Sequence, residues 1–317
     1  MLHNSKSIIF FGTSEFAIPI LEALHKESYE IVAVVTTPDS AIGRKQILTP
    51  PPIKVTAQKL GFEILQPQSL KIGSLKNSLE VENLKLKIAD ADVGVVASYG
   101  KIIPKEIISS FPKGILNIHP SLLPKYRGPS PIQHALFNGD KETGITIILL
   151  DEKVDHGPVV ARQESKIINY ELWEELHNKL AKMGAELLVK TLPDYLAGKI
   201  KPKPQENSRA TFTKIITKED GKINWHKKAE EIHNQFRAFH KWPGIYTLWQ
   251  DKILKIIDCK IYLGVQLPSG KIYQENEHLF VPCSKGRIEL LKLQFEGGKV
   301  LTTKEFINGY GKFLKKV

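Results

Sequence analysis

The sequence predicts an α/β protein in two parts: a Rossmann-like, doubly wound parallel sheet followed by a smaller β domain. Two observations favour the sheet. An apolar run at residues 7–12 leads through a helical pattern to a second strand at 30–35, and strand and helix patterns keep alternating up to residue 192. A third observation favours the β domain, because short alternating segments separated by Gly and Pro turns follow residue 246, as in a small barrel.

The first domain is expected to span residues 1–196. A dinucleotide enzyme is disfavoured, because the turn after Gly12 lacks the second and third glycines of the Rossmann fingerprint. The long helix that ends the domain is expected to stop at Pro193. The predicted strands lie at 7–12, 30–35, 62–66, 93–98, 114–119, 143–150 and 157–168, and the predicted helices start near Phe16 and cover 75–89, 131–138 and 171–192.

Residues 197–208 have the composition of a linker, with Gly and Pro among lysines, so the second domain is expected to span residues 209–317. A helical pattern at 229–239 opens it. The predicted strands that follow lie at 246–249, 253–262, 271–273, 278–283 and 287–295.

The charge of the chain is concentrated in its last third. The 317 residues carry a net charge of +11, and residues 207–317 hold 20 Lys and Arg against 11 Asp and Glu, a net of +9. A polyanion such as RNA is a natural partner for such a surface, and a solubilising surface explains the charge equally well.

Several classes of protein are disfavoured by the composition. The two cysteines, Cys259 and Cys283, form no C-x-x-C pair, which argues against a structural metal or a disulfide framework. No apolar run approaches the length of a membrane span, and the first strand begins too early for a targeting peptide to precede it. A soluble, cytoplasmic, monomeric protein without a membrane partner is expected.

The stretch from Gly114 to Gly128 carries the chemistry. Asn117 and His119 are two residues apart in a strand, so they leave the backbone on one face, and Pro120 holds His119 extended at the strand's carboxyl end. In a parallel α/β sheet, ligands bind at that edge. An amide and an imidazole there suit nucleophilic attack on a carbonyl, although a turn-capping Asn and a satisfied strand-end His explain an isolated pair as well.

The residues that follow the pair give it a family context. Ser-Leu-Leu-Pro-x-x-Arg-Gly directly after Asn-x-His-Pro resembles the signature of the formyltransferases that use 10-formyltetrahydrofolate. The resemblance implies that Asn, His and a later Asp before a Gly carry catalysis, and that the Ser-Leu-Leu-Pro segment and the end of the 93–98 strand with the loop after it lie at the folate. Carried over, the catalytic residues are Asn117, His119 and Asp155, and the folate-binding residues are Ser121, Leu122, Leu123, Pro124, Tyr99 and Ile103.

Two further segments are similar to the methionyl-tRNA branch of these formyltransferases. They are Gly-Thr-Ser-Glu-Phe-Ala after the first strand and a Pro-Asp…Gly-Arg loop at residues 36–54. The resemblance implies that Arg44, with Lys45 beside it, contacts the acceptor end of tRNA, and that the second domain is OB-like and binds tRNA. Ser40 and Gln46-Ile47 stand where this branch commonly has basic residues, which weakens the electrostatic share of the loop.

The reaction implied by the resemblance is transfer of the formyl group of 10-formyltetrahydrofolate to the α-amino group of methionyl-initiator tRNA, without a metal. Three alternatives stay open: a sugar-nucleotide amine formyltransferase, a formyltetrahydrofolate hydrolase that uses the same three residues on water, and a noncatalytic RNA-binding protein. His156 is either a second imidazole near the site or a solvent-facing loop residue.

Overall fold

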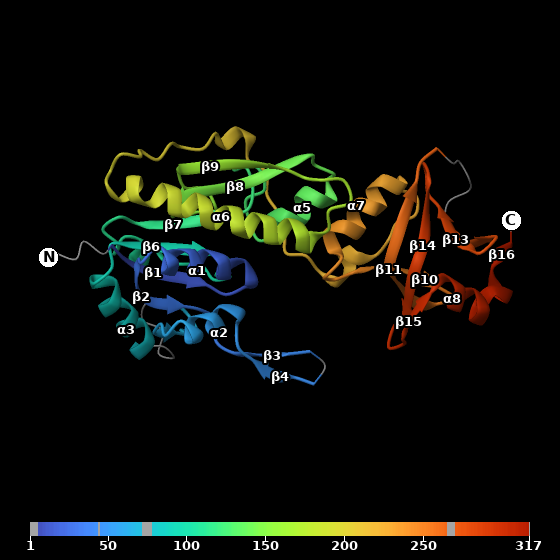
Figure 1. Cartoon of the computed structure of the whole chain (residues 1–317), viewed down its shortest axis with the longest axis horizontal. Coiled ribbons are helices and arrows are strands. Elements are labelled where there is room, and N and C mark those ends of the chain that lie inside the picture. Colours follow the sequence, from blue (N-terminus) through green and yellow to red (C-terminus); the bar gives the residue numbers. More distant parts are fainter. Residues whose placement is uncertain (1–5, 44, 72–77, 265–269, 317) are drawn as a thin grey trace. The chain divides into compact units, whose positions relative to one another are not determined.

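The computed structural model describes residues 6–43, 45–71, 78–264 and 270–316, and the chain divides into two compact units (Figure 1). The first unit comprises Met1–Pro131, Glu142–Lys166 and His177–Thr213. The second unit comprises Ile132–Lys141, Ile167–Leu176 and Lys214–Val317. The second unit is therefore drawn from three separate stretches of the chain. The domain boundaries expected from composition stay a prediction.

A seven-stranded sheet forms the centre of the first unit. The strands run in the order β5-β2-β1-β6-β7-β8-β9, and the pairs from β5 to β7 are parallel. The predicted doubly wound sheet is thus confirmed as mostly parallel, and at one edge β8 pairs antiparallel with both β7 and β9. The strands are β1 Ser7–Gly12, β2 Glu30–Val35, β5 Ile64–Leu65, β6 Val93–Ala97, β7 Ile115–His119, β8 Glu142–Leu149 and β9 Val159–Lys166.

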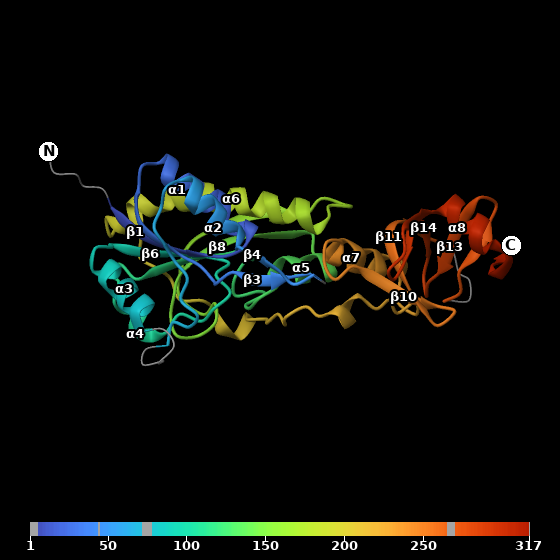
Figure 2. The same ribbon diagram turned by 90° about the horizontal axis from the view of Figure 1, so that it is seen from below.

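Helices cover both faces of this sheet. Figure 2 shows α1 (Ile18–Lys26) and α6 (Trp173–Leu196) on one face and α3 (Ser78–Ala89) with α4 (Lys105–Ile108) on the other. Successive residues of each strand point to opposite faces of the sheet, so they contribute alternately to the hydrophobic core on each face. On the α3 and α4 face, side chains from β1, β2 and β7 form one buried cluster with both helices, including Ile9, Phe11, Val35, Leu84, Ile88, Ile107 and Ile115.

Two local expectations differ from the structure. The 36–54 loop contains a two-stranded hairpin, β3 (Ser40–Ile42) with β4 (Ile47–Thr49), and α2 (Pro52–Lys59) begins inside it. These strands pair only with each other in the described sheets and are mostly exposed, so no hydrophobic alternation announces them. Helix α6 runs through Pro193 to Leu196, because a proline near the last turn gives up one N–H while its carbonyl still accepts from Ala197.

An antiparallel sheet dominates the second unit, which confirms the predicted β domain. Its order is β10-β11-β14-β13-β12-β16, with β15 on β14, and β12 and β16 pair in parallel. Helices α7 (Ala229–Phe239) and α8 (Thr303–Tyr310) pack on it, and α8 was not predicted. The strands are β10 Ile245–Trp249, β11 Lys252–Tyr262, β12 Tyr273–Glu275, β13 His278–Pro282, β14 Arg287–Phe295, β15 Val300–Thr302 and β16 Lys315–Lys316.

The remaining elements are short. Helix α5 (Pro131–Phe137) follows the signature stretch, and single 3-10 turns are η1 Glu15–Ala17, η2 Asn207–Arg209, η3 Lys218–Gly221 and η4 Gly311–Phe313. Within the described parts of the chain, no helix combines the length and apolarity needed to cross a bilayer.

Candidate active site

Strand β7 places Asn117 and His119 on one face of the sheet, as their spacing predicts. The intervening Ile118 points to the opposite face, where a Cβ added to Gly184 of α6 would lie 2.9 Å from its Cγ2. His119 is the last residue of β7 and is only 5% exposed. The imidazole therefore sits at the carboxyl end of a central strand, where open α/β sheets bind ligands.

Asp155 reaches the same face from the connection between β8 and β9. This connection folds back tightly, because Leu149 N–H donates to the Pro158 carbonyl at 2.9 Å. A Cβ on Gly157 would lie 1.8 Å from the Leu149 carbonyl oxygen, so only glycine permits this approach. The tight return carries the Asp155 carboxylate over β7.

The Asp155 carboxylate is the hub of the cluster. Its Oδ1 accepts a hydrogen bond from Asn117 Nδ2 at 3.1 Å and lies 3.5 Å from His119 Nδ1. Its Oδ2 accepts from the Gly128 N–H at 2.7 Å. The structure thus brings together the three residues that the sequence proposed as catalytic, from two separate parts of the sheet.

The second nitrogen of His119 defines the tautomer. His119 Nε2 lies 2.9 Å from the Tyr126 carbonyl, and because a carbonyl can only accept, Nε2 carries a proton. His119 Nδ1 then faces the Asp155 carboxylate. Asn117 uses one of its two amide protons on Asp155, and an amide nitrogen has a second proton to donate.

The Ser-Leu-Leu-Pro segment forms a fixed turn after β7. Thr146 Oγ1 on β8 donates to the Ser121 carbonyl at 2.6 Å and accepts from Leu123 N–H at 3.1 Å, and Arg162 donates to the Leu123 carbonyl. Ser121 and Leu123 are fully buried, whereas Leu122 and Pro124 are partly exposed. Of the four residues of this segment that are proposed to bind folate, Leu122 and Pro124 have side chains accessible to a ligand.

The structure places Tyr99 and Ile103 in the core. Both side chains belong to the buried cluster on the α3 and α4 face, and the Tyr99 ring packs edge-on against Phe11 at 5.6 Å. Burial raises the pKa of the Tyr99 phenol. The Tyr99 carbonyl accepts from Thr13 Oγ1 at 2.7 Å, which ties this strand end to the first turn of the sheet. A role of either residue at the folate stays a prediction.

The other proposed residues lie apart from the cluster. His156 Nδ1 is 2.6 Å from Asp151 Oδ2, so its imidazole turns to Asp151 and forms an ion pair when protonated. Lys45 is exposed in the turn between β3 and β4, and Arg44 lies outside the described residues. Among the residues that the structure describes, no group of three or more His, Cys, Asp or Glu is placed to hold a metal ion.

Sequence reasoning missed two residues that support the cluster. Arg127 is 4% exposed and donates to Gln205, and Gln205 donates to the carbonyls of Asp155 and Gly157. Arg127 is the Arg near the end of the signature stretch, so the motif itself could have pointed to it. Gln205 lies in a segment of linker composition, and nothing in that segment indicates a role at the site.

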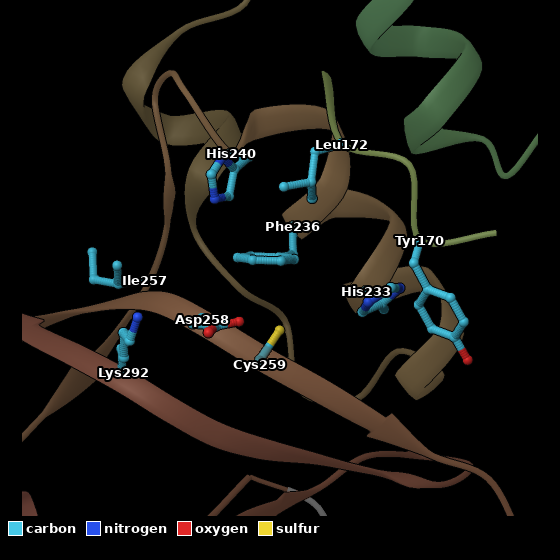
Figure 3. Close-up of a pocket in the computed structure, with 9 residues that line it drawn as sticks. All are labelled: Tyr170, Leu172, His233, Phe236, His240, Ile257, Asp258, Cys259 and Lys292. Carbon is cyan, nitrogen blue, oxygen red and sulfur yellow. The ribbon is translucent and has the colours of Figure 1, made fainter. Parts of the chain in front are cut away.

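The second unit contains a pocket of about 440 Å³ (Figure 3). Helix α7 and strands β11 and β14 contribute to its lining, which includes Phe236, His233, His240, Asp258, Cys259 and Lys292. Burial and the neighbouring Arg237 guanidinium lower the pKa of His233 to about 4. Burial also raises the pKa of the Cys259 thiol, which makes it a poor nucleophile.

Comparison with known proteins identifies the family. Residues 5–192 match the model of the family described as formyl transferase, and residues 215–311 match that of the formyl transferase C-terminal domain. The methionyl-tRNA formyltransferase of Thermodesulfovibrio yellowstonii is 41% identical over 305 residues, 96% of each chain. The chain belongs to the methionyl-tRNA formyltransferase family. The family member of Halalkalibacterium halodurans is 38% identical over 96% of this chain and 95% of its own.

Solved structures agree with this family's fold. The sugar 3N-formyl transferase WlaRD superposes with a TM-score of 0.65 at 19% identity, over 90% of this chain and 98% of its own. HypX from Aquifex aeolicus, solved with tetrahydrofolic acid, superposes with a TM-score of 0.64 at 15% identity, over 99% of this chain and 49% of its own. At these identities the likeness concerns the fold alone.

Proposed function

We propose that this methionyl-tRNA formyltransferase family member transfers the formyl group of 10-formyltetrahydrofolate to the α-amino group of methionine carried by initiator tRNA. The observation that carries the proposal is the Asn117, His119 and Asp155 cluster at the carboxyl end of β7, in a chain about 40% identical to named methionyl-tRNA formyltransferases over nearly its full length.

In the proposed reaction the neutral amine of methionine attacks the formyl carbon and forms a C–N bond. The formyl oxygen becomes an oxyanion, which the second Asn117 amide proton would stabilise, joined by His119 once its Nε2–H turns from the Tyr126 carbonyl to the substrate. Asp155 would orient both side chains and assist removal of the proton from the attacking nitrogen. The tetrahedral intermediate then breaks its bond to the folate nitrogen, which takes up a proton and leaves as tetrahydrofolate.

Lys45, in the turn between β3 and β4, and Arg44, which lies outside the described residues, remain our proposed contacts to the acceptor end of tRNA. Lys45 is exposed there, as such a contact requires. The excess of +9 in residues 207–317 supports a wider contact to the tRNA backbone. We further propose a monomeric, cytoplasmic enzyme that needs no metal, in keeping with a carboxylate whose two oxygens already accept N–H donors.

One assay tests the acceptor. The protein is given 10-formyltetrahydrofolate together with methionyl-tRNA, with an amino-sugar nucleotide, or with no acceptor, after dialysis against a chelator. We expect formyl-methionyl-tRNA as the main product. Formylated sugar, or free formate at the same rate without acceptor, would refute the proposal, and activity restored only by added metal would refute the metal-free mechanism.

A further inference from the structure

The backbone of Asp155 adopts a left-handed conformation. Its φ is +47°, in a region that residues other than glycine occupy infrequently, although Asp and Asn enter it more often than the rest. A residue held there needs support from its surroundings. The Gly128 N–H holds the Asp155 carboxylate, but it does not hold the backbone that carries it.

Gln205 supplies a support for that backbone. Its Nε2 donates to the Asp155 carbonyl at 2.9 Å and to the Gly157 carbonyl at 2.8 Å. The two carbonyls lie on either side of His156, so a single amide group spans the residue that follows Asp155. Gln205 is 50 positions away from Asp155 in the sequence, and its contacts are therefore tertiary.

Arg127 sets the orientation of the Gln205 amide. Arg127 Nε and Nη2 donate to Gln205 Oε1 at 3.2 and 2.8 Å, and Nη2 also donates to Asn207 Oδ1 at 2.7 Å. A guanidinium only donates, so the Gln205 oxygen must face Arg127 and the nitrogen must face the two carbonyls. The Gln205 amide nitrogen could not accept from Arg127, and the Gln205 amide oxygen could not donate to the two carbonyls.

The residues around Gln205 also hold the carbonyl that contacts His119. Tyr126 N–H donates to Thr211 Oγ1 at 2.8 Å, Arg127 N–H donates to the Thr211 carbonyl at 2.9 Å, and Thr213 N–H donates to the Arg127 carbonyl at 2.8 Å. We call residues 203–213 the brace. It is fastened along the signature stretch, so Gln205 is presented to Asp155 from a fixed backbone.

We propose that Gln205 is a positioning residue for Asp155, and that its amide N–H groups, oriented by Arg127, keep the Asp155 carboxylate within reach of Asn117 and His119. This inference rests on the proposed function, because it assigns Gln205 a part in the same reaction. Gln205 itself touches neither substrate nor a reacting atom; it acts through the Asp155 backbone.

The substitution Gln205→Glu tests the donor end of the side chain separately from its acceptor end. A carboxylate keeps, and strengthens, the acceptor for Arg127, but it removes both donors and sets a negative charge against two carbonyls. We expect kcat to fall about tenfold or more, the scale of a displaced catalytic group, with KM for both substrates changed less than twofold. The matched control is Gln163→Glu, the same change at an exposed position of β9, which should leave kcat unchanged.

A second readout is the coupling to Asp155. If Gln205 acts through Asp155, then Gln205→Glu should cost less than twofold when added to an Asp155→Asn protein, although it costs tenfold alone. Near-normal kcat for a folded Gln205→Glu protein, or an equal loss in both backgrounds, would overturn the proposal.

Two controls keep the outcomes distinct. Near-normal turnover of Asp155→Asn would reject the role proposed for Asp155, whatever Gln205 does, whereas an unmodified protein that makes no formyl-methionyl-tRNA would reject the proposed function itself. Should Gln205→Glu fail to fold, Gln205→Leu, which removes the donors without adding a charge, carries the same expectation. Thermal unfolding of each variant establishes that a loss of kcat is not a loss of folded protein.

Discussion

At the scale of single residues, the candidate site is a carboxylate shared between an amide and an imidazole. Asp155 Oδ1 faces both Asn117 Nδ2 and His119 Nδ1, so removing any one member changes the partners of the other two. The local pattern of β7 predicted the face that Asn117 and His119 share, and the motif that follows them gave them their proposed catalytic role. Asp155 was found through a motif, because nothing in its own segment indicates that the loop returns to β7.

We expect Asn117→Ala, His119→Ala and Asp155→Asn each to lower turnover by about a hundredfold or more, the scale of a lost oxyanion donor or acid/base group. Because the three act as a unit, a double substitution should cost less than the product of the single ones. His156→Ala is the matched control, since this imidazole pairs with Asp151. Steady-state formylation rates decide, and a folded His119→Ala protein with near-normal turnover would contradict the assignment.

A second residue-level prediction concerns stability and pH. His233 titrates near pH 4 in the folded protein and near 6.5 when unfolded, so between these values the unfolded chain binds more protons. Above about pH 6.5, His233 is neutral in both states and does not lower the free energy of unfolding. As the pH falls toward 4, protonation of His233 in the unfolded chain lowers the free energy of unfolding by up to about 3 kcal/mol.

The free energy of unfolding in urea should therefore fall less between pH 7 and 5 in a His233→Asn protein than in the unmodified one. His226→Asn, at an exposed imidazole, should keep the steeper fall. Equal slopes for all three proteins would contradict a buried neutral His233.

At the scale of elements, the sequence predicted where the strands lie better than how they run. Strands β1 and β2 match their expected ranges to the residue, because their apolar runs are bounded by clear turns. The direction of β8 escaped prediction, since a run of buried residues looks the same in a parallel and in an antiparallel strand. The brace was not predicted for another reason. Hydrogen bonds from polar side chains hold it in place, and a segment rich in such residues looks like a linker by its composition.

The tight return between β8 and β9 gives an element-level prediction. Gly157→Ala forces a Cβ against the Leu149 carbonyl, so the connection must move and carry Asp155 with it. We expect kcat to fall at least tenfold, with a lower melting temperature. Gly309→Ala is the control, because a Cβ at this helical position meets nothing within 4 Å and should stabilise the protein by about 0.5–1 kcal/mol. Unchanged kcat in the Gly157→Ala protein would show that the loop relaxes without cost.

At the scale of the whole molecule, the division into units does not follow a single cut in the sequence. Within the second unit, Phe137 stacks on Phe239 at 5.6 Å, and Arg237 donates to the Glu171 carbonyl. A chain shortened near Glu206 would therefore leave apolar parts of the second unit behind and would remove Thr211 from the brace. Substitutions in the full chain are the sounder way to test the basic surface.

If residues 207–317 follow the tRNA backbone, binding should weaken as salt rises, with a log-log slope that drops by roughly 0.7 to 0.9 for each phosphate contact removed. Exposed lysines such as Lys260, Lys285 and Lys304 are replaced by serine in turn, with Lys182 of α6 as the control. Titration of labelled tRNA at several salt concentrations measures the slopes. If none of the second-unit substitutions changes the slope, the tRNA binds elsewhere on the protein.

The brace also has a consequence for the order of events in folding. Its contacts join residues 50, 78 and 85 positions apart, whereas helices and hairpins close over short distances. Long-range closures cost more chain entropy and are made late. During refolding from urea, the helices and the β8–β9 and β10–β11 hairpins should return before the enzyme can turn over. The nascent chain, likewise, acquires a competent Asp155 only after Thr213 has emerged from the ribosome, long after the catalytic residues themselves have been made.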